Sequence, residues 1–192
     1  MGACCGPRRK TDDETAAVLR FALAGSLVLG AALGAFAVRA VARVGINQGY
    51  SPAQPIAFSH QLHAGESRIP CLYCHYAAAR SLHAGIPAAS VCMNCHGMLT
   101  RQTPEIEKLR ESVLQQRSIR WVKVHNLPGF VHFDHSRHVR ASVACQTCHG
   151  PVERMVRVQQ QAPLTMGWCL SCHEARGVGD NGARTDCVRC HY

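Results

Sequence analysis

Five copies of one short motif constrain this chain of 192 residues more than any other feature. Each copy has the pattern C-x-x-C-H, in which two thiols can form thioether links to a c-type haem and the histidine can bind its iron. With 12 Cys and 12 His in the chain, chance alone would produce roughly 0.05 copies. The five copies therefore predict five covalently attached haem c groups.

We number the motifs 1 to 5 in chain order, and their residues form two sets. The predicted thioether cysteines are Cys71, Cys74, Cys92, Cys95, Cys145, Cys148, Cys169, Cys172, Cys187 and Cys190. The predicted proximal iron ligands are His75, His96, His149, His173 and His191.

Zinc sites, redox dithiols and disulfides also use C-x-x-C, but none of them requires a histidine directly after the second cysteine. Only Cys4 and Cys5 lie outside the motifs. Because c-type cytochromes acquire their haem on the outer side of the bacterial cytoplasmic membrane, the motifs predict a periplasmic location for this part of the chain.

An uncharged run of 18 residues, Phe21–Val38, lies between Arg20 and Arg39 near the N-terminus. As a helix it would be about 27 Å long, close to the roughly 30 Å of a bilayer core. We predict a single retained anchor in the bacterial inner membrane with the N-terminus inside. A cleaved signal sequence is the alternative, since Ala35-Phe36-Ala37 resembles a cleavage site.

Small residues recur every four positions along this run, at Ala22, Ser26, Gly30 and Gly34. Such a stripe lets a second helix backbone approach closely in lipid, which favours a membrane-embedded partner. The alternative is an alanine-rich anchor that merely contains glycines.

The predicted organisation follows from these features. It comprises a cytoplasmic tail (1–17), an anchor helix (18–42), a linker (43–59) and a pentahaem domain (60–192), itself divided into a two-haem part (60–100), a linking helix (103–118) and a three-haem part (125–192). One haem for roughly 30 residues leaves too little chain for a conventional core. The fold class is therefore a transmembrane helix plus short helices and loops wrapped round five haems, with little sheet.

Two elements are predicted inside the haem domain. Thr103 is placed to cap a helix over Pro104–Arg117, where proline suits the first position and an apolar stripe follows. The alternation from Ile119 to Val124 suggests a short strand.

Seven histidines remain outside the motifs as candidates for the distal iron ligands. Two segments, Phe58–His63 and Phe133–His138, share the pattern F-x-H-x-x-H and each precede a motif by a similar distance. Histidines three residues apart lie on one face of a helical turn, where they can serve two different haems. The candidates are His60, His63, His83, His125, His135 and His138, with His132 and Met166 ranked lower.

The formal net charge is +9, which we interpret as compensation for the haem propionates rather than as a nucleic-acid site. No constellation of acid, base or nucleophile is apparent. An electron-transfer role is therefore favoured over catalysis, whereas a multihaem reductase would need a haem with an open axial position.

The segments CLYCHYAAARSLHAGIPAASVCMNCH, WVKVHNLPGFVHFDHSRHV, ACQTCHGPV, MGWCLSCH and CVRCHY closely resemble the membrane-anchored pentahaem subunit of alternative complex III, a bacterial quinol oxidoreductase. The F-x-H-x-x-H segments also resemble c3- and c7-type cytochromes. The first resemblance implies bis-histidine ligation, and it brings His125 more firmly into the ligand set.

The resemblance also implies partners and a role. The partners are a membrane-embedded quinol-oxidising subunit, a periplasmic iron–sulfur subunit and a monohaem cytochrome c, with a cytochrome c or a terminal oxidase as acceptor. The chain would then be an electron-transfer subunit, not an enzyme by itself. A stand-alone membrane-anchored quinol dehydrogenase of the NapC/NirT type is the alternative.

Overall fold

The computed structural model describes residues 10–42, 44–100, 102–177 and 185–191. The chain divides into two compact units, Met1–Gly45 and Ile46–Tyr192. Residues 1–9 of the expected tail, with Cys4, Cys5, Arg8 and Arg9, lie outside the described residues, as do residues 178–184 and Tyr192.

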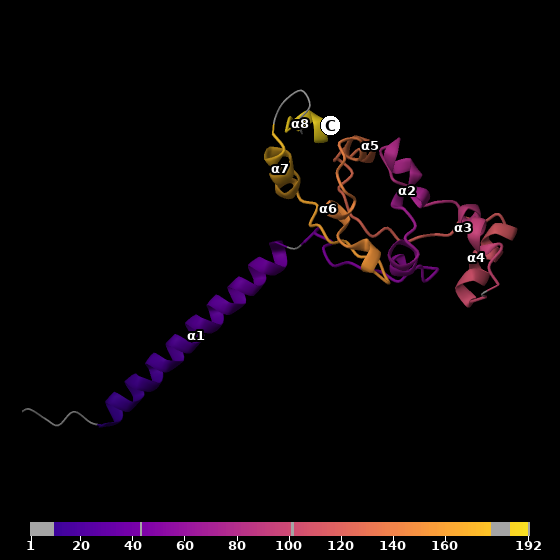
Figure 1. Cartoon of the computed structure of the whole chain (residues 1–192). Coiled ribbons are helices and arrows are strands. Elements are labelled where there is room, and N and C mark those ends of the chain that lie inside the picture. Colours follow the sequence, from indigo (N-terminus) through magenta and orange to yellow (C-terminus); the bar gives the residue numbers. More distant parts are fainter. Residues whose placement is uncertain (1–9, 43, 101, 178–184, 192) are drawn as a thin grey trace, which may run out of the picture. The chain divides into compact units, whose positions relative to one another are not determined.

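The first unit contains one long helix, α1 (Lys10–Ala42) (Figure 1). Its segment Glu14–Val41 has a mean hydropathy of 2.1, and none of it is buried within the structure. By length and composition this helix could cross a membrane, a test that a signal sequence near the N-terminus would also pass. The stripe glycines are open, because a Cβ added at Gly30 or Gly34 would meet nothing within 4 Å.

The second unit is built from short helices, which confirms the predicted mostly helical class. They are the π-helix η1 (Gln61–Glu66), α2 (Cys71–Cys74), the 3-10 helix η2 (Tyr76–Ala79), α3 (Ala89–His96), α4 (Pro104–Leu114), α5 (His135–Arg140), α6 (Gln146–His149), the 3-10 helix η3 (Val152–Arg154), α7 (Met166–Ala175) and α8 (Cys187–Cys190). Each C-x-x-C-H motif thus lies on or beside a helix of its own, namely α2, α3, α6, α7 and α8.

The side-chain core of the second unit is very small. Its buried apolar residues are Ala78, Leu109, Val124, Met155 and Ala162. Gln160 is the largest fully buried side chain among the described residues, and it accepts from Asn126 N and donates to Ala162 O. A core of this size leaves the space between the helices to be filled by something other than side chains.

Helix α4 begins as predicted and ends early. The Thr103 hydroxyl accepts from Ile106 N, and Pro104 occupies the first turn. The predicted end at Arg117 is wrong by three residues, since the helix stops at Leu114. Gln116 has a φ of 52°, in the left-handed region, and the Ser112 hydroxyl donates to Arg117 O, which together close the last turn.

The predicted strand at Ile119–Val124 is also wrong. These residues pair with no neighbouring strand in the described part of the chain, and only an isolated bridge joins Val131 to His191. The side chain of Gln54 takes the place of a ladder partner, donating to Val122 O and accepting from Val122 N. Residues of the expected linker are thereby packed into the second unit, where Gly49 N also donates to Gln160 O.

Candidate haem-binding sites

Three motif histidines lie opposite a histidine from an F-x-H-x-x-H segment. The ring centroids are 6.0 Å apart for His63 and His96, 6.4 Å for His135 and His149, and 6.1 Å for His138 and His173. A histidine nitrogen lies about 2.0 Å from a metal that it binds, so two imidazoles on opposite sides of one iron have centres about 6 Å apart. The three separations match that requirement.

The two F-x-H-x-x-H segments have the same local geometry despite their different helix types. Phe58 stacks on His63 at 4.2 Å and meets His60 edge-on at 4.9 Å. Phe133 repeats this arrangement, at 4.5 Å from His138 and 4.7 Å from His135. The phenylalanine therefore fixes both ring orientations in each segment.

Backbone carbonyls orient four of the candidate imidazoles. Nδ1 lies 2.8 Å from Ser59 O in His63, 2.9 Å from Asp134 O in His138, 2.8 Å from Leu82 O in His135 and 2.7 Å from Gly85 O in His75. A proton on Nδ1 donated to a carbonyl leaves Nε2 as the free lone pair, which is how haem-ligating histidines are held. Sequence reasoning missed these carbonyls, because a backbone acceptor has no residue-type signature.

His60 lies close to His75 of motif 1. Burial, and then the proximity of His75 and His63, lowers the pKa of His60 to about 4. Its Nδ1 is buried without a hydrogen-bond partner, as is Nδ1 of His96. Neutral, buried imidazoles of this kind suit a site where iron binds the other nitrogen.

His149 of motif 3 has two imidazole neighbours with different geometry. His135 faces it with nearly parallel rings at 9°, whereas His125 meets it edge-on with centroids only 4.5 Å apart. His149 Nδ1 lies 3.0 Å from His125 Nε2. Burial and the neighbouring histidines lower the pKa of His149 to about 4. In this arrangement His125 contacts Nδ1 of the motif histidine.

The remaining candidates lie elsewhere. His83 is exposed, on the loop between η2 and α3. His132 N donates to Cys190 O at 2.8 Å, and Phe130 stacks on His191 at 5.9 Å. His132 is thus bonded through its backbone to motif 5. Met166 is 61% exposed at the start of α7.

The ten motif cysteines are all free thiols, and all are exposed or half-buried. Among the described residues, no three His, Cys, Asp or Glu side chains converge as a bare metal ion would require. Burial raises the pKa of Cys74, Cys92, Cys148 and Cys169. The donor set of paired imidazoles beside accessible thiol pairs therefore fits haem c better than zinc.

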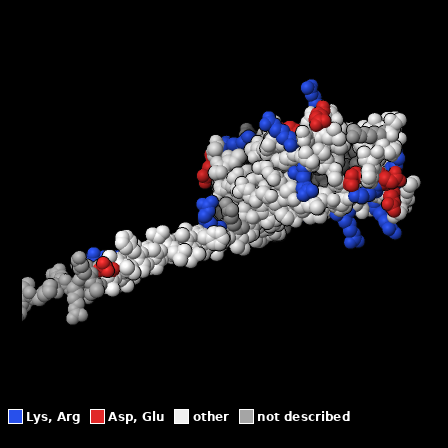
Figure 2. Space-filling view, turned by 90° about the horizontal axis from the view of Figure 1, so that it is seen from below, with Lys and Arg blue, Asp and Glu red and all other residues white. Residues whose placement is uncertain are grey.

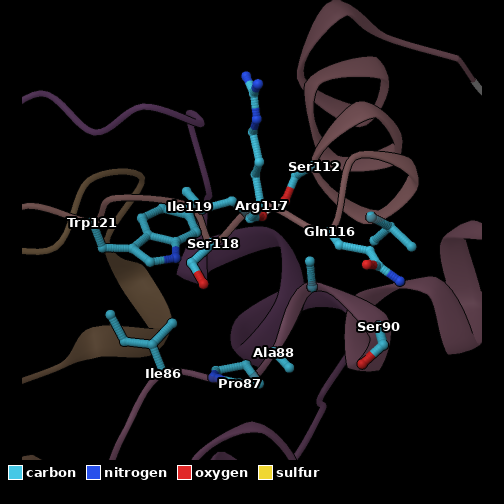
Figure 3. Close-up of a pocket in the computed structure, with 12 residues that line it drawn as sticks. Ile86, Pro87, Ala88, Ser90, Ser112, Gln116, Arg117, Ser118, Ile119 and Trp121 are labelled. Atoms are coloured by element: carbon cyan, nitrogen blue, oxygen red, sulfur yellow. Dashed lines mark hydrogen bonds between the residues drawn. The ribbon is translucent and has the colours of Figure 1, made fainter.

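Two surface features lie outside these sites. A recess of about 420 Å³ is lined by Ile86, Ser90, Arg117 and Trp121 among others, but by no cysteine or histidine, so it is not a haem cavity (Figure 3). Figure 2 shows Lys and Arg interspersed with Asp and Glu on the visible face of the second unit, without a continuous basic stripe.

Comparison with known proteins agrees with this geometry. Residues 131–192, which hold motifs 3 to 5, match the family of cytochrome c7 and related cytochrome c. The chain is also 30% identical over 162 residues to the multiheme cytochrome c subunit of a menaquinone reductase from Nitratidesulfovibrio vulgaris, covering 72% of this chain and 76% of that protein. This chain belongs to the family of multihaem cytochrome c subunits. The predicted likeness to c7-type cytochromes is thereby confirmed, and the cytochrome's role is electron transfer.

Proposed function

We propose that the cytochrome carries five haem c groups and relays electrons within a quinone-linked membrane complex. Haem iron supplies a one-electron carrier at each motif. The observation that carries the proposal is the pairing of imidazoles across from the motif histidines at the separation that one iron requires.

Three of the proposed ligand pairs follow from the ring separations: His63 with His96, His135 with His149, and His138 with His173. The fourth, His60 with His75, rests on the influence of His75 on the pKa of His60 and on the analogy with His135 in the second F-x-H-x-x-H segment. In this scheme each F-x-H-x-x-H segment serves two haems, the first histidine facing its own motif and the second facing the next. His191 is the proximal ligand of the fifth haem, and His83 stays a candidate distal ligand.

The complex that we propose is alternative complex III or a close relative of it. The partners would be a membrane-embedded quinol-oxidising subunit, a periplasmic iron–sulfur subunit and a monohaem cytochrome c, with a cytochrome c or terminal oxidase as acceptor. The name of the N. vulgaris relative, a subunit of a menaquinone reductase, supports a quinone-linked assembly. Helix α1 would be a retained anchor in the inner membrane, with the second unit on the periplasmic side.

The alternative of a stand-alone quinol dehydrogenase of the NapC/NirT type makes a different prediction for the isolated chain. Purification from native membranes in mild detergent, followed by intact-mass analysis, tests both the haem number and the partners. We expect the mass of the chain plus five haems and co-purification of a multispanning subunit. A solitary cytochrome that a quinol analogue reduces at physiological rates would overturn the subunit proposal.

A further inference from the structure

The five motifs do not neighbour one another in chain order. Figure 1 shows α3 beside α4 at one end of the second unit, α2 and α6 between, and α7 with α8 at the other end. Contacts of the motifs, of the histidines that face them and of the segments beside them define the neighbours.

Motifs 1 and 2 are directly bonded. Asn94, inside motif 2, donates from Nδ2 to the hydroxyl of Tyr73, inside motif 1, at 3.2 Å. Both motifs also take a histidine from η1, because His60 lies by His75 and His63 faces His96.

Of the neighbouring motif pairs, motifs 1 and 3 lie furthest apart in the sequence. Helix α5, which holds His135 of the motif 3 site, packs against η2, the helix directly after motif 1. The loop after η2 also holds α5, since His135 N donates to Leu82 O and Ser136 N donates to Ser81 O. On the other side, η1 packs against η3, and Gln61 N donates to Met155 O.

Motifs 3 and 4 are joined by α5, because His135 faces His149 and His138 faces His173. Motif 5 lies at the same end of the unit as α7 in Figure 1, and the segment that leads into α5 is bonded to it, since His132 N donates to Cys190 O and Val131 pairs with His191. After burial, Cys190 is also the first of the neighbouring thiols that raise the pKa of Cys169, which favours motif 4 as its neighbour.

We propose that the five attachment motifs form a single row in the order 2–1–3–4–5, so that motifs 2 and 5 hold the two end haems. This inference rests on the proposed function, because it requires five haems. Motif 3 is then the centre of the row, and motifs 2 and 5 are the positions through which partners exchange electrons. The order along the row differs from the order along the chain.

The test measures how strongly each haem senses the charge of every other one. Oxidising one haem adds a positive charge, which raises the midpoint potential of its neighbours. Doubling the distance at least halves this effect, and salt screening reduces it further. A redox titration of the intact holoprotein, followed by NMR of the ferric haem methyl signals, gives the coupling for each pair of haems.

The variants His60→Met, His63→Met, His135→Met and His138→Met assign the signals of motifs 1 to 4, and the remaining set belongs to motif 5. A variant that loses its haem assigns the missing set equally well. We expect couplings at least about twofold stronger for pairs 2–1, 1–3, 3–4 and 4–5 than for all other pairs. A coupling of 2 with 3, or of 1 with 4, as strong as that of 2 with 1 would overturn the order. The measurement needs neither quinone nor partner, so a failure of the proposed complex would appear in co-purification and leave this test intact.

Discussion

At the scale of single residues, the chain controls its haem sites through imidazole orientation. A histidine has two ring nitrogens, and the partner of one decides which of them is free. In His63 and His138 the partner is the carbonyl four residues earlier, so the same backbone turn that places the ring also directs Nε2. The F-x-H-x-x-H pattern therefore determines the orientation of its histidine rings as well as their position.

His63→Met should convert one bis-histidine site into a His/Met site. Methionine ligation raises haem potential, by on the order of 100 mV, and the other four haems should keep their bis-histidine spectra. Spectroelectrochemistry with near-infrared magnetic circular dichroism would record both changes. Leu62→Met, on the same exposed turn, is the matched control. An unchanged spectrum in His63→Met would remove His63 from the ligand set.

His125→Leu separates a hydrogen-bond role from a ligand role. If His125 only accepts from His149 Nδ1, all haems stay low-spin, and one potential rises because the proximal imidazole becomes a weaker donor. A lost hydrogen bond worth about 1 kcal/mol corresponds to roughly 40 mV for one electron.

His135→Leu provides the contrast, because loss of a distal ligand should give a high-spin ferric signal in EPR. A high-spin signal of the same intensity in His125→Leu would instead make His125 the distal ligand of motif 3.

At the scale of elements, the short helices are stabilised by contacts with one another, because each is too short to be stable alone. Helices α2 and α6, for example, have only four residues each. Their positions depend on contacts such as that between η1 and η3, where the backbone of Gly65 lies directly against the carbonyl of Glu153.

Gly65→Ala tests this close approach. The added Cβ would collide with the Glu153 carbonyl oxygen, so η1 and η3 must move apart, at a cost of about 1–3 kcal/mol in the free energy of unfolding. Denaturant unfolding of the holoprotein would measure the loss. Gly129→Ala is the control, since its Cβ meets nothing within 4 Å. Equal stability of the two variants would show that the η1–η3 contact tolerates a side chain.

At the scale of the whole molecule, the second unit lacks the apolar core that a chain of its length would need to fold unaided. Haem attachment therefore supplies much of the apolar surface that is buried in the second unit. Helix α1, in contrast, carries an apolar surface that stays exposed. That helix is exposed along its described length, with Phe21, Leu27 and Phe36 each more than 70% exposed.

The double variant Gly30→Leu and Gly34→Leu should weaken association with a membrane partner while keeping the anchor apolar. Loss of close helix packing worth about 1–2 kcal/mol corresponds to roughly tenfold weaker association. Quantitative mass spectrometry of the co-purified subunits in mild detergent would measure it. Ala32→Leu, on another face of α1, is the control, and equal recovery of partners from both proteins would contradict a role for the stripe.

The sequence by itself determined the chemistry of this protein. Five C-x-x-C-H motifs, the repeated F-x-H-x-x-H pattern, the capped start of α4 and the apolar run of α1 are local patterns, and each depends on residues a few positions apart. The errors were local too. The helix predicted to reach Arg117 ends at Leu114, because Gln116 adopts a left-handed conformation. The predicted strand at Ile119–Val124 does not form, and Val122 N instead donates to the side chain of Gln54.

Only the tertiary structure decided how these patterns meet. The bond from Ser136 N to Ser81 O, the carbonyls that hold His75 and His135, and the contact of His125 with His149 all join residues ten or more positions apart. Backbone acceptors have no residue-type signature, and the order of motifs in space depends on how loops close round a core that the chain does not itself supply. For that reason the sequence predicts haem sites, whereas their order in a row follows from the fold.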